Sequence, residues 1–198
     1  MIKFNNLNQE LPYQVFKTRY DEAINSGQKS IEAITISSFN TTISEVDSRY
    51  VNLKYINNDE FIFFSNYNSP KAQSFICHDQ IAAIFYWHNI NIQIRMKAKI
   101  KKTSNEFNNK YFCKRSEEKN ALAISSNQSQ SIHSYQEVKK KYNKTLKNDD
   151  LKKCPDYWGG LSFKPYYFEF WEGHESRINK REVYNLIDGK WSHLFLQP

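Results

Sequence analysis

The segment "YWGGLSFKPYYFEFWEGHESRINKR", residues 157–181, decides how this chain is interpreted. It holds three of the five glycines and two of the four tryptophans of the entire sequence. An aromatic run typical of a strand lies between the glycine pair and a charged cluster that ends in arginine. The chain is otherwise poor in both residue types, and composition alone does not say why they gather here.

The length of 198 residues suits one domain with a real core, because 39% of the residues are hydrophobic and 16% are aromatic. No run of about 18 apolar residues occurs, so we expect no transmembrane helix and no membrane partner. The N-terminus lacks a continuous apolar stretch, so we expect no signal peptide. Cys77, Cys113 and Cys154 are far apart and form no CxxC pair, which favours free thiols in a reducing cytoplasm.

The formal net charge of +7 fits either an anionic partner or a solvated, lysine-rich surface. The longest basic stretch, residues 137–153, is interrupted by acids and accompanies no nucleic-acid motif, so we expect no nucleic-acid partner. Only Gly27 precedes Gly159, which excludes a GxGxxG turn and a P-loop. The histidines are scattered, so we expect no metal site. A phosphorylated cofactor would have to be held by side chains and helix N-termini.

Hydrophobic periodicity and turn signals predict a mainly β chain with helices between hairpins. The predicted helices are 11–27, 69–79, 103–115, 117–127 and 134–147. The predicted strands are 30–39, 48–56, 60–66, 80–88, 90–102, 160–171, 177–187 and 190–196. Ser69 before Pro70, and Thr103 with Glu106 at capping-box spacing, mark two helix starts. We therefore expect an α+β fold, a β-barrel or curled sheet with peripheral helices.

Several polar positions are candidates for ligand contacts. In "SRYVNLK" (48–54), strand alternation places Arg49 and Lys54 on opposite faces. Lys71 lies at a predicted helix N-terminus, where a phosphate binds well. Gln93 is a polar group in a predicted sheet, and "SSNQS" (125–129) offers small hydrogen-bonding groups. Each signal alone is more often an ion pair, a cap or a turn.

In this order, the segments resemble the pyridoxamine 5'-phosphate oxidase family of FMN-binding flavoproteins. The resemblance covers roughly residues 31–198 and rests on "SRYVNLK", "FFSNYNSPKA", "AIFYWHNINIQIR", "KYFCKR", "SSNQS", "YWGG", "EFWEG", "SRINKR" and the terminal Trp191, Leu196 and Pro198. It implies one homodimeric, FMN-binding split-barrel domain over 1–198. Residues 1–28 would form an N-terminal helical segment, and 157–198 the strands that complete the site. Gly159 and Gly160 would let the backbone turn into the strand after Trp158.

The resemblance implies that FMN lies at a two-fold dimer interface. The implied cofactor residues are Arg49, Tyr50, Val51, Asn52, Leu53, Lys54, Phe64, Ser65, Lys71, Gln93, Gln128, Ser129, Trp171 and Arg181. Arg49 and Lys71 would bind the FMN phosphate, and Gln93 would face the edge of the isoalloxazine ring.

The substrate implied by the family is a phosphorylated B6 vitamer. The implied substrate residues are Lys54, Tyr111, Arg115, Lys119, Arg177 and Asn179, of which Arg177 and Asn179 would be catalytic. Lys54, Tyr111 and Arg115 match the contacts to the substrate phosphate. Pyridoxamine or pyridoxine 5'-phosphate would be oxidised to pyridoxal 5'-phosphate, with O2 as acceptor and H2O2 as product.

Four positions depart from the family pattern. Asn179 replaces a histidine, and asparagine carries no proton near neutral pH. Lys119 replaces a serine that contacts the substrate phosphate, while Pro70 and Phe195 each replace an arginine. The cofactor pattern is therefore kept better than the substrate pattern.

These departures leave alternatives open. One is an FMN oxidase for another reduced aromatic substrate of the dihydrophenazine type, which Asn179 and Lys119 favour. Another is a non-catalytic flavin- or haem-binding split-barrel protein. The last is a basic nucleic-acid-binding protein.

Overall fold

Strand β8 (Trp158–Glu172) is the longest strand and contains most of the segment that decided the sequence interpretation. Along one edge it pairs antiparallel with β7 (Ile92–Lys102). Along the other edge it pairs first with β5 (Glu60–Asn66) and then with β9 (Lys180–Ile187). One strand thus joins the middle of the chain to its C-terminal hairpin.

The computed structural model describes all residues from 1 to 198. The remaining strands are β1 (Lys3–Asn5), β2 (Ala33–Asn40), β3 (Glu45–Asn52), β4 (Tyr55–Asn57), β6 (Gln80–Trp87) and β10 (Lys190–Leu196). The helices are α1 (Leu11–Asn25), α2 (Pro70–Cys77), α3 (Asn105–Phe112), α4 (Glu117–Ser125) and α5 (Tyr135–Asn148), with a short 3-10 turn at His88–Ile90.

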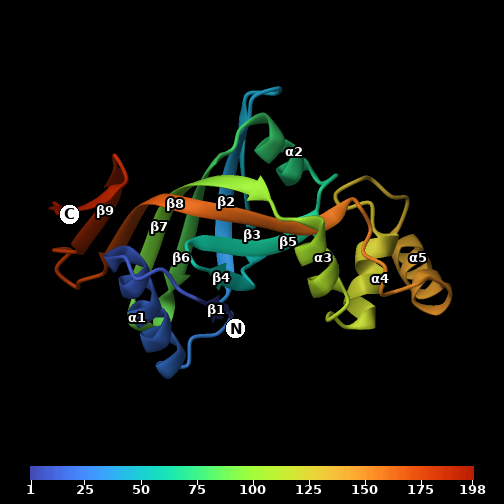
Figure 1. The fold of residues 1–198 in the computed structure, drawn as a ribbon, viewed down its shortest axis with the longest axis horizontal. Helices are drawn as coiled ribbons and strands as arrows, with labels where there is room; N and C mark the ends of the chain where they lie inside the picture. The colour runs from blue at the N-terminus through green and yellow to red at the C-terminus, as the bar shows by residue number, and fades with distance from the viewer.

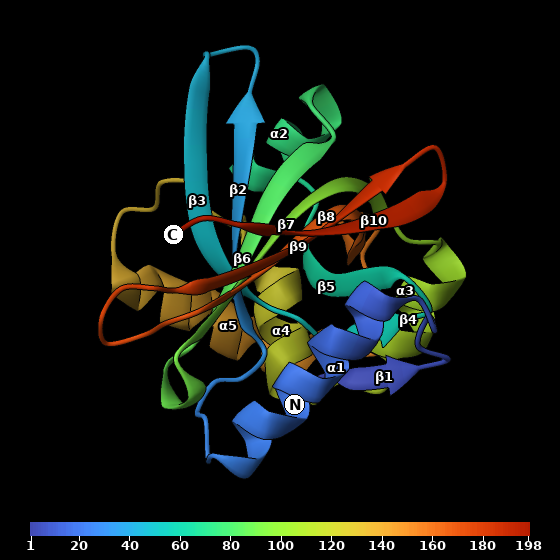
Figure 2. The same cartoon turned by 90° about the vertical axis from the view of Figure 1, so that its left-hand side faces the viewer.

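All strands belong to one ten-stranded sheet in the order β1-β4-β5-β8-β7-β6-β2-β3, with β9 and β10 attached to β8. Helix α1 lies below the sheet, α3 to α5 form one end of the molecule, and the β9–β10 hairpin lies at the other (Figure 1). The β2–β3 hairpin rises above the sheet (Figure 2). The predicted mainly β fold with peripheral helices is confirmed. None of the helices is long and apolar enough to cross a membrane.

Helix α1 buries an aromatic face against the sheet. Tyr13, Phe16, Tyr20 and Ala23 are at most 3% exposed, as helical spacing predicts. The Phe16 ring meets Phe61 edge-on with centroids 5.2 Å apart, and it also packs on Phe85 and Trp87. Burial of each such ring contributes roughly 1.5–3 kcal/mol. The main core therefore lies between α1 and the sheet, away from α3 to α5.

The prediction of one strand over 48–56 is wrong. Its first half, β3, pairs with β2, whereas its second half, β4, pairs with β5. The Leu53 N–H donates to the Glu32 carbonyl and the Lys54 N–H donates to the Ile62 carbonyl. At this change of partner, the Leu53 side chain is fully buried in the core. Alternation alone does not reveal such a change of partner.

One prediction at a helix start is also wrong, and one short strand was missed. Ser104, not Thr103, caps α3, because its hydroxyl accepts the Phe107 N–H at 3.2 Å. Thr103 instead donates to Asn108 Oδ1 at 2.6 Å. The short strand β1, which pairs in parallel with β4, was not predicted, because three residues give no periodic signal.

The glycine pair after Trp158 allows close packing and does not form a turn. Gly159 and Gly160 lie inside β8, opposite Ser65 and Phe64, and neither has a positive φ. A Cβ at Gly159 would lie 2.2 Å from Tyr67 Oη and 2.3 Å from Asn108 Nδ2. Those two side chains form a hydrogen bond with each other. The Tyr67 hydroxyl also donates to the Gly160 carbonyl, and the Gly160 N–H donates to Asn108 Oδ1. The glycines therefore let α3 sit directly on β8.

We predict that Gly159→Ala lowers the free energy of unfolding by about 2 kcal/mol, since the new methyl group must displace Tyr67 and Asn108. Denaturant unfolding measures the change. The control is Gly189→Asn, because nothing lies within 4 Å of a Cβ there and asparagine tolerates its positive φ of 77°. Equal stability of both variants would contradict the packing role of Gly159.

Candidate active site

A cavity of about 640 Å³ opens between the β3–β4 segment, β5 and the α3–α4 segment. This volume is in the range of small-molecule sites. Of the predicted cofactor residues, Tyr50, Val51, Asn52, Lys54, Phe64, Ser65, Lys71 and Gln128 line it. Of the predicted substrate residues, Lys54, Tyr111, Arg115 and Lys119 line it. The structure therefore brings together residues from positions 50 to 128 that the sequence could only nominate one by one.

Three aromatic rings form one wall of the cavity. Phe64 of β5 stacks on Tyr111 of α3 with centroids 3.7 Å apart, and on Trp158 of β8 at 5.3 Å. The Arg115 guanidinium lies over the Trp158 ring at 4.5 Å. Stacking fixes the positions of these side chains before any ligand arrives, and the Arg115 charge is held at the wall by a cation–π contact.

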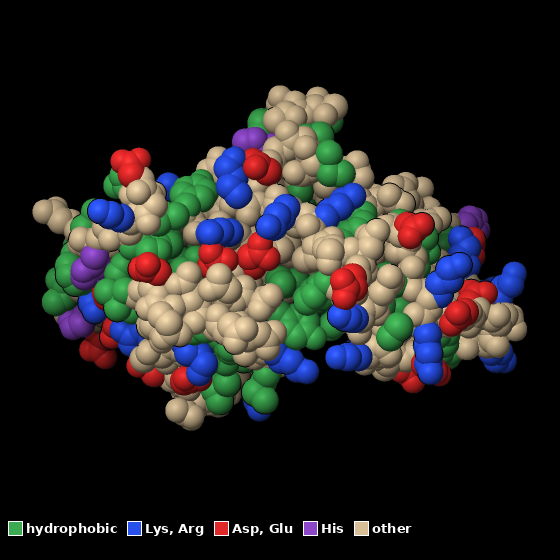
Figure 3. Space-filling model, in the orientation of Figure 1, with side chains coloured by type: hydrophobic (Ala, Val, Ile, Leu, Met, Phe, Trp, Pro, Cys, Tyr) green, Lys and Arg blue, Asp and Glu red, His purple; other side chains and the backbone are tan.

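The charge of the cavity is entirely positive. Five cationic side chains line it and no carboxylate does: Lys54, Lys71, Lys114, Arg115 and Lys119. None of the five takes part in an ion pair within the chain, whereas other lysines, such as Lys99 and Lys164, pair with a carboxylate. Figure 3 shows further basic side chains on the end of the molecule formed by α4 and α5. An anionic ligand would supply the missing counter-charge.

The cations form two groups. Burial lowers the pKa of Lys71, and its neighbour Arg49 lowers that pKa further. Burial also lowers the pKa of Lys54; Glu32 opposes this shift, while the neighbouring cations Lys119 and Arg115 add to it. Lys71 lies in the first turn of α2, whose N–H groups add positive potential. The cavity therefore offers two separate positive centres.

Arg49 lies beside this cavity without lining it. Its Nη1 donates to Ser38 Oγ at 2.8 Å, and its Nη2 pairs with the exposed Asp47. The Leu53 side chain points into the core, so only the backbone of that residue is near the cavity. Ser129 lines a smaller adjacent hollow of about 140 Å³.

Hydrogen bonds among polar residues that line the cavity connect β5 to the loop after α4. Gln128 Oε1 accepts from the Ser65 hydroxyl and from the Asn66 N–H, both at 3.4 Å, while Asn66 Nδ2 donates to the Ser126 carbonyl. Ser65 and Asn66 are each 5% exposed. Because these hydrogen bonds are long and therefore weak, the same donors and acceptors can reorient toward a ligand.

Sequence reasoning missed several residues that line the cavity. They are Asn66, Lys114, Ser116, Leu122, Ala123, Ser126 and Trp158. Trp158 belongs to the segment 157–181, on which the interpretation of the sequence rests. Asn66 lies between a predicted strand and a predicted helix N-terminus. Those signals were present in the sequence, but Leu122 and Ala123 of α4 carried none.

The remaining predicted residues lie at the other end of the sheet. Gln93, Trp171 and Arg181 occupy paired positions across β7, β8 and β9, and none lines the cavity. Arg177 and Asn179 lie in the β8–β9 loop, near the end of the molecule opposite α4 (Figure 1). Within one chain, the predicted site is therefore divided into two halves.

The β8–β9 loop has a defined shape. Asn179 Oδ1 accepts the His174 N–H at 3.0 Å, and the Arg177 N–H donates to the His174 carbonyl at 2.9 Å. Arg177 has a positive φ of 62°, which is uncommon for a residue with a long side chain. The Asn179 side chain closes the loop, so its oxygen is engaged and its Nδ2 remains available.

A buried carboxylate organises this second half. Glu169 is 2% exposed and accepts from Arg181 Nε at 2.9 Å, Arg95 Nη1 and the Tyr167 hydroxyl. Burial, followed by the bond to Glu169, raises the pKa of Tyr167 to about 12. Arg181 Nη1 also donates to the Gln197 carbonyl, which ties the C-terminus to β9.

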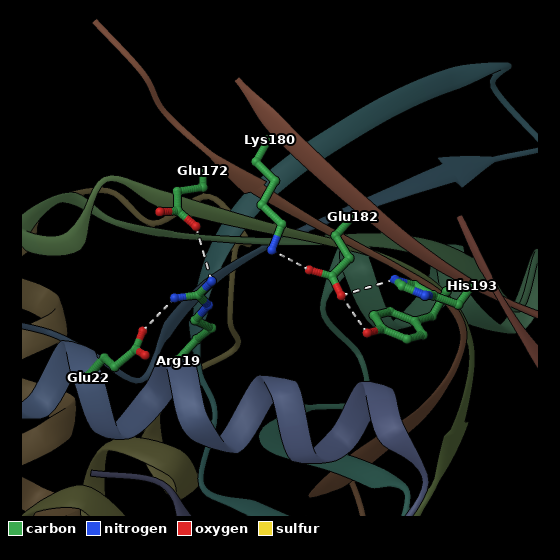
Figure 4. A network of polar contacts seen from close by, with 7 residues as sticks. Arg19, Glu22, Glu172, Lys180, Glu182 and His193 are labelled. Carbon is green, nitrogen blue, oxygen red and sulfur yellow. Dashed lines mark hydrogen bonds and ion pairs between the residues drawn. The ribbon is translucent and has the colours of Figure 1, made fainter. Parts of the chain in front are cut away.

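Two more exposed groups of ion pairs lie near α1 and the C-terminal hairpin (Figure 4). Arg19 pairs with Glu22 on its own helix and with Glu172 at the end of β8. Glu182 accepts from Lys180, His193 and Tyr184. The first group joins α1 to the end of β8, and the second joins β9 to β10.

Comparisons with known proteins agree with the fold and the sequence pattern. Residues 158–198 match the family model described as the pyridoxine 5'-phosphate oxidase C-terminal dimerisation region. The pyridoxine/pyridoxamine 5'-phosphate oxidase 1 of Hydrogenovibrio crunogenus is 32% identical over 94% of this chain and 88% of that protein. The Cytophaga hutchinsonii pyridoxine/pyridoxamine 5'-phosphate oxidase is 33% identical with the same coverage.

The chain belongs to the pyridoxine/pyridoxamine 5'-phosphate oxidase family. It is thus related to oxidoreductases, and FMN, the predicted cofactor, is the cofactor of this family.

Solved structures with little sequence identity share the fold. PhzG from Burkholderia lata, solved with tetrahydrophenazine-1-carboxylic acid, superposes with a TM-score of 0.87 at 20% identity, covering 94% of this chain and 92% of that chain. A pyridoxamine 5'-phosphate oxidase-related, FMN-binding protein from Nostoc punctiforme superposes with a TM-score of 0.78 at 12% identity, covering 96% and 99%.

We predict that Glu169→Ala lowers the free energy of unfolding by about 2 kcal/mol, because Arg181 and the Tyr167 hydroxyl lose a buried partner. Chemical denaturation measures the effect. The matched control is Glu172→Ala, which breaks an exposed pair on the same strand and costs less than about 1 kcal/mol. A larger loss in the Glu172 variant would show that Glu169 does not organise this end of the sheet.

Proposed function

We propose that this chain is an FMN-dependent oxidase that converts pyridoxamine or pyridoxine 5'-phosphate to pyridoxal 5'-phosphate, with O2 as acceptor and H2O2 as product. The observation that carries the proposal is a cavity whose lining combines two groups of cations with aromatic and polar side chains. A phosphorylated cofactor and a phosphorylated substrate together need two such centres.

The residues near Lys71 fit the FMN phosphate. Lys71 and Arg49 supply charge, the α2 N-terminus supplies free N–H groups, and Ser65 and Gln128 supply adaptable hydrogen bonds. The backbone of residues 50–53 runs along the same cavity and offers an edge for a flat ring. FMN, when bound, supplies the group that accepts a hydride from the substrate carbon.

The second positive centre fits the substrate phosphate. Lys54, Arg115 and Lys119 would bind its oxygens, and Tyr111 would donate from its hydroxyl. Stacking of Tyr111 on Phe64 and of Arg115 on Trp158 holds these groups in place. The phosphate would therefore act as a handle that orients the ring for reaction.

A dimer would complete the site. The two halves lie at opposite ends of one chain, and the matched dimerisation region covers 158–198. Leu194, Phe195 and Leu196 are at least 37% exposed on β10, which suits an interface between two copies. We propose that Gln93, Trp171, Ser129 and Arg181 reach FMN only in this dimer, and that Arg177 and Asn179 reach the substrate there.

In the completed site, Arg177 would lie over the substrate ring and exclude water from its exposed face. Asn179 Nδ2 would donate to a ring oxygen, because Oδ1 already accepts from His174. Asparagine cannot exchange a proton near neutral pH, so proton transfer would fall to solvent or to the substrate itself. This chain therefore positions the reactants more than it moves protons.

A second candidate is an oxidase for a reduced aromatic acid. The replacement of the family histidine by Asn179 favours it, because a different ring substituent would then need recognition. The shared fold with PhzG is compatible with either candidate. A monoanionic carboxylate, however, needs fewer cations than the three at the second positive centre.

We predict that the FMN-loaded protein forms pyridoxal 5'-phosphate and peroxide from pyridoxine or pyridoxamine 5'-phosphate in air. Arg177→Ala should lower turnover about a hundredfold, because the substrate loses its positioning contact, while the protein stays yellow. The control is Lys180→Ala in the same segment. A yellow wild-type protein with no turnover on either compound would reject the B6 substrate and favour the aromatic-acid alternative.

We also predict that the two positive centres can be separated by mutation. Lys71→Ala should raise the Kd of FMN about tenfold or more, whereas Lys54→Ala should leave it nearly unchanged and raise the KM of the phosphorylated substrate by a similar factor. Flavin fluorescence titration and steady-state kinetics measure the two effects. Loss of FMN in the Lys54 variant alone would reverse the assignment.

A further inference from the structure

Two of the three cysteines lie beside the aromatic wall of the cavity. Cys113 is the C-cap residue of α3, and Cys154 lies in the segment that leads into β8. Both are free thiols, and neither lines the cavity. We propose that Cys113 and Cys154 form an oxidation site, at which hydrogen peroxide converts the two thiols to one intramolecular disulfide. The inference goes beyond the proposed function, because neither thiol is assigned to FMN or to the substrate.

The segment before β8 is held against the end of α3. The Cys113 thiol donates to the Lys152 carbonyl at 3.4 Å, two residues before the second cysteine. Asn120, which is 1% exposed, donates from Nδ2 to the Leu151 and Phe112 carbonyls, both at 2.9 Å. Neighbouring residues on one side are thus bonded to neighbouring residues on the other. The Cys113 sulfur therefore already contacts the backbone that carries the second cysteine.

The two thiols also share their surroundings. The Cys154 thiol donates to the Trp158 carbonyl at 3.6 Å. Phe112, the residue before Cys113, packs edge-on against the Trp158 ring with centroids 5.1 Å apart. Burial first, and then the neighbouring Cys113, raises the pKa of the Cys154 thiol to about 11. Contacts on both sides of Cys154 therefore bring its sulfur near that of Cys113, which is the first requirement for a disulfide.

The two cysteines differ in exposure and therefore in role. Cys113 is exposed, so peroxide reaches its sulfur first, whereas Cys154 is half-buried. The Cys113 thiolate attacks one peroxide oxygen and the O–O bond breaks. The hydroxide that leaves takes up the proton released by the thiol, which gives a sulfenic acid and one water. The Cys154 sulfur then attacks the sulfenic sulfur, and the hydroxyl group leaves with the Cys154 proton as a second water.

Pairing with Cys154 protects Cys113 from irreversible oxidation. A sulfenic acid that finds no thiol is oxidised further to sulfinic and sulfonic acids, whereas a disulfide is reversed by reduction. The proposed reaction releases peroxide, so an exposed cysteine beside the cavity would meet this oxidant repeatedly. The disulfide would also close a loop that contains α4 and α5, which restricts the unfolded chain and stabilises the oxidised protein.

Peptide mapping of the full-length, FMN-loaded protein tests the inference without any substrate. After a small molar excess of hydrogen peroxide, mass spectrometry under non-reducing conditions should find two peptides linked through Cys113 and Cys154, which a reductant separates. The linked protein should have a Tm about 5 °C above that of the reduced protein. The control is Cys77→Ser, which removes the other exposed cysteine and should give the same linked peptides.

Single variants separate the roles of the two thiols. Cys154→Ser should form no link and should accumulate roughly fivefold more sulfinic and sulfonic acid at Cys113 than the wild-type protein. Cys113→Ser should form no link and should leave the half-buried Cys154 unmodified. The map of the wild-type protein decides the pairing alone, whether or not a variant folds. Higher oxides of Cys113 without a link, or links only between two chains, would overturn the proposal. Absence of turnover on B6 vitamers would instead reject the proposed function and leave this result unaffected.

Discussion

The position of β8 is the constraint on which the rest of the structure depends. Its first half pairs with β5 and places Trp158 in the cavity wall, whereas its second half pairs with β9 and carries Glu169 and Trp171. Both halves of the candidate site are thus attached to one continuous strand. A strand is stiff over this length, so the distance between the halves is set by the sheet and cannot be closed within one chain. The separation is therefore a built-in property and not a loose arrangement that a ligand would collapse.

The cations that line the cavity make the empty protein less stable. Lys54, Lys71 and Arg115 are partly buried without a carboxylate partner, which is unfavourable for the empty protein because burial penalises the charged form. Stability comes instead from the core between α1 and the sheet, where the aromatic rings are fully buried. Anionic ligands offset the unfavourable charge when they bind, so they should stabilise the fold by mass action. The separation of core and cavity lets the chain keep such an unfavourable site.

Much of the fold could be predicted from the sequence, because α1, α2 and the β6–β7 hairpin carry strong periodic and capping signals. The break at Leu53 could not, since it depends on which strand the backbone pairs with and not on local alternation. The glycine pair was recognised as special, but its reason, the approach of Tyr67 and Asn108, comes from residues far away in sequence. Leu122 and Ala123 of α4 were missed in the cavity for the same reason, whereas the family resemblance had named Lys119 of the same helix. Local sequence patterns predict helices and strands, whereas packing between residues far apart in the sequence decides which side chains meet.

Two departures from the family pattern are compatible with each other under the proposed function. Asn179 lacks the titratable ring of the family histidine, but its side-chain oxygen closes the loop that carries Arg177. Lys119 adds a charge to the end of the cavity that already holds Lys54 and Arg115. Under the proposed function, the first change would weaken direct proton transfer at the ring, and the second would strengthen the binding of a remote anionic group. Binding energy from a remote group can support positioning at the reacting centre. Under the proposed function, the chain would therefore rely more on the orientation of a charged substrate than on acid–base chemistry beside the ring.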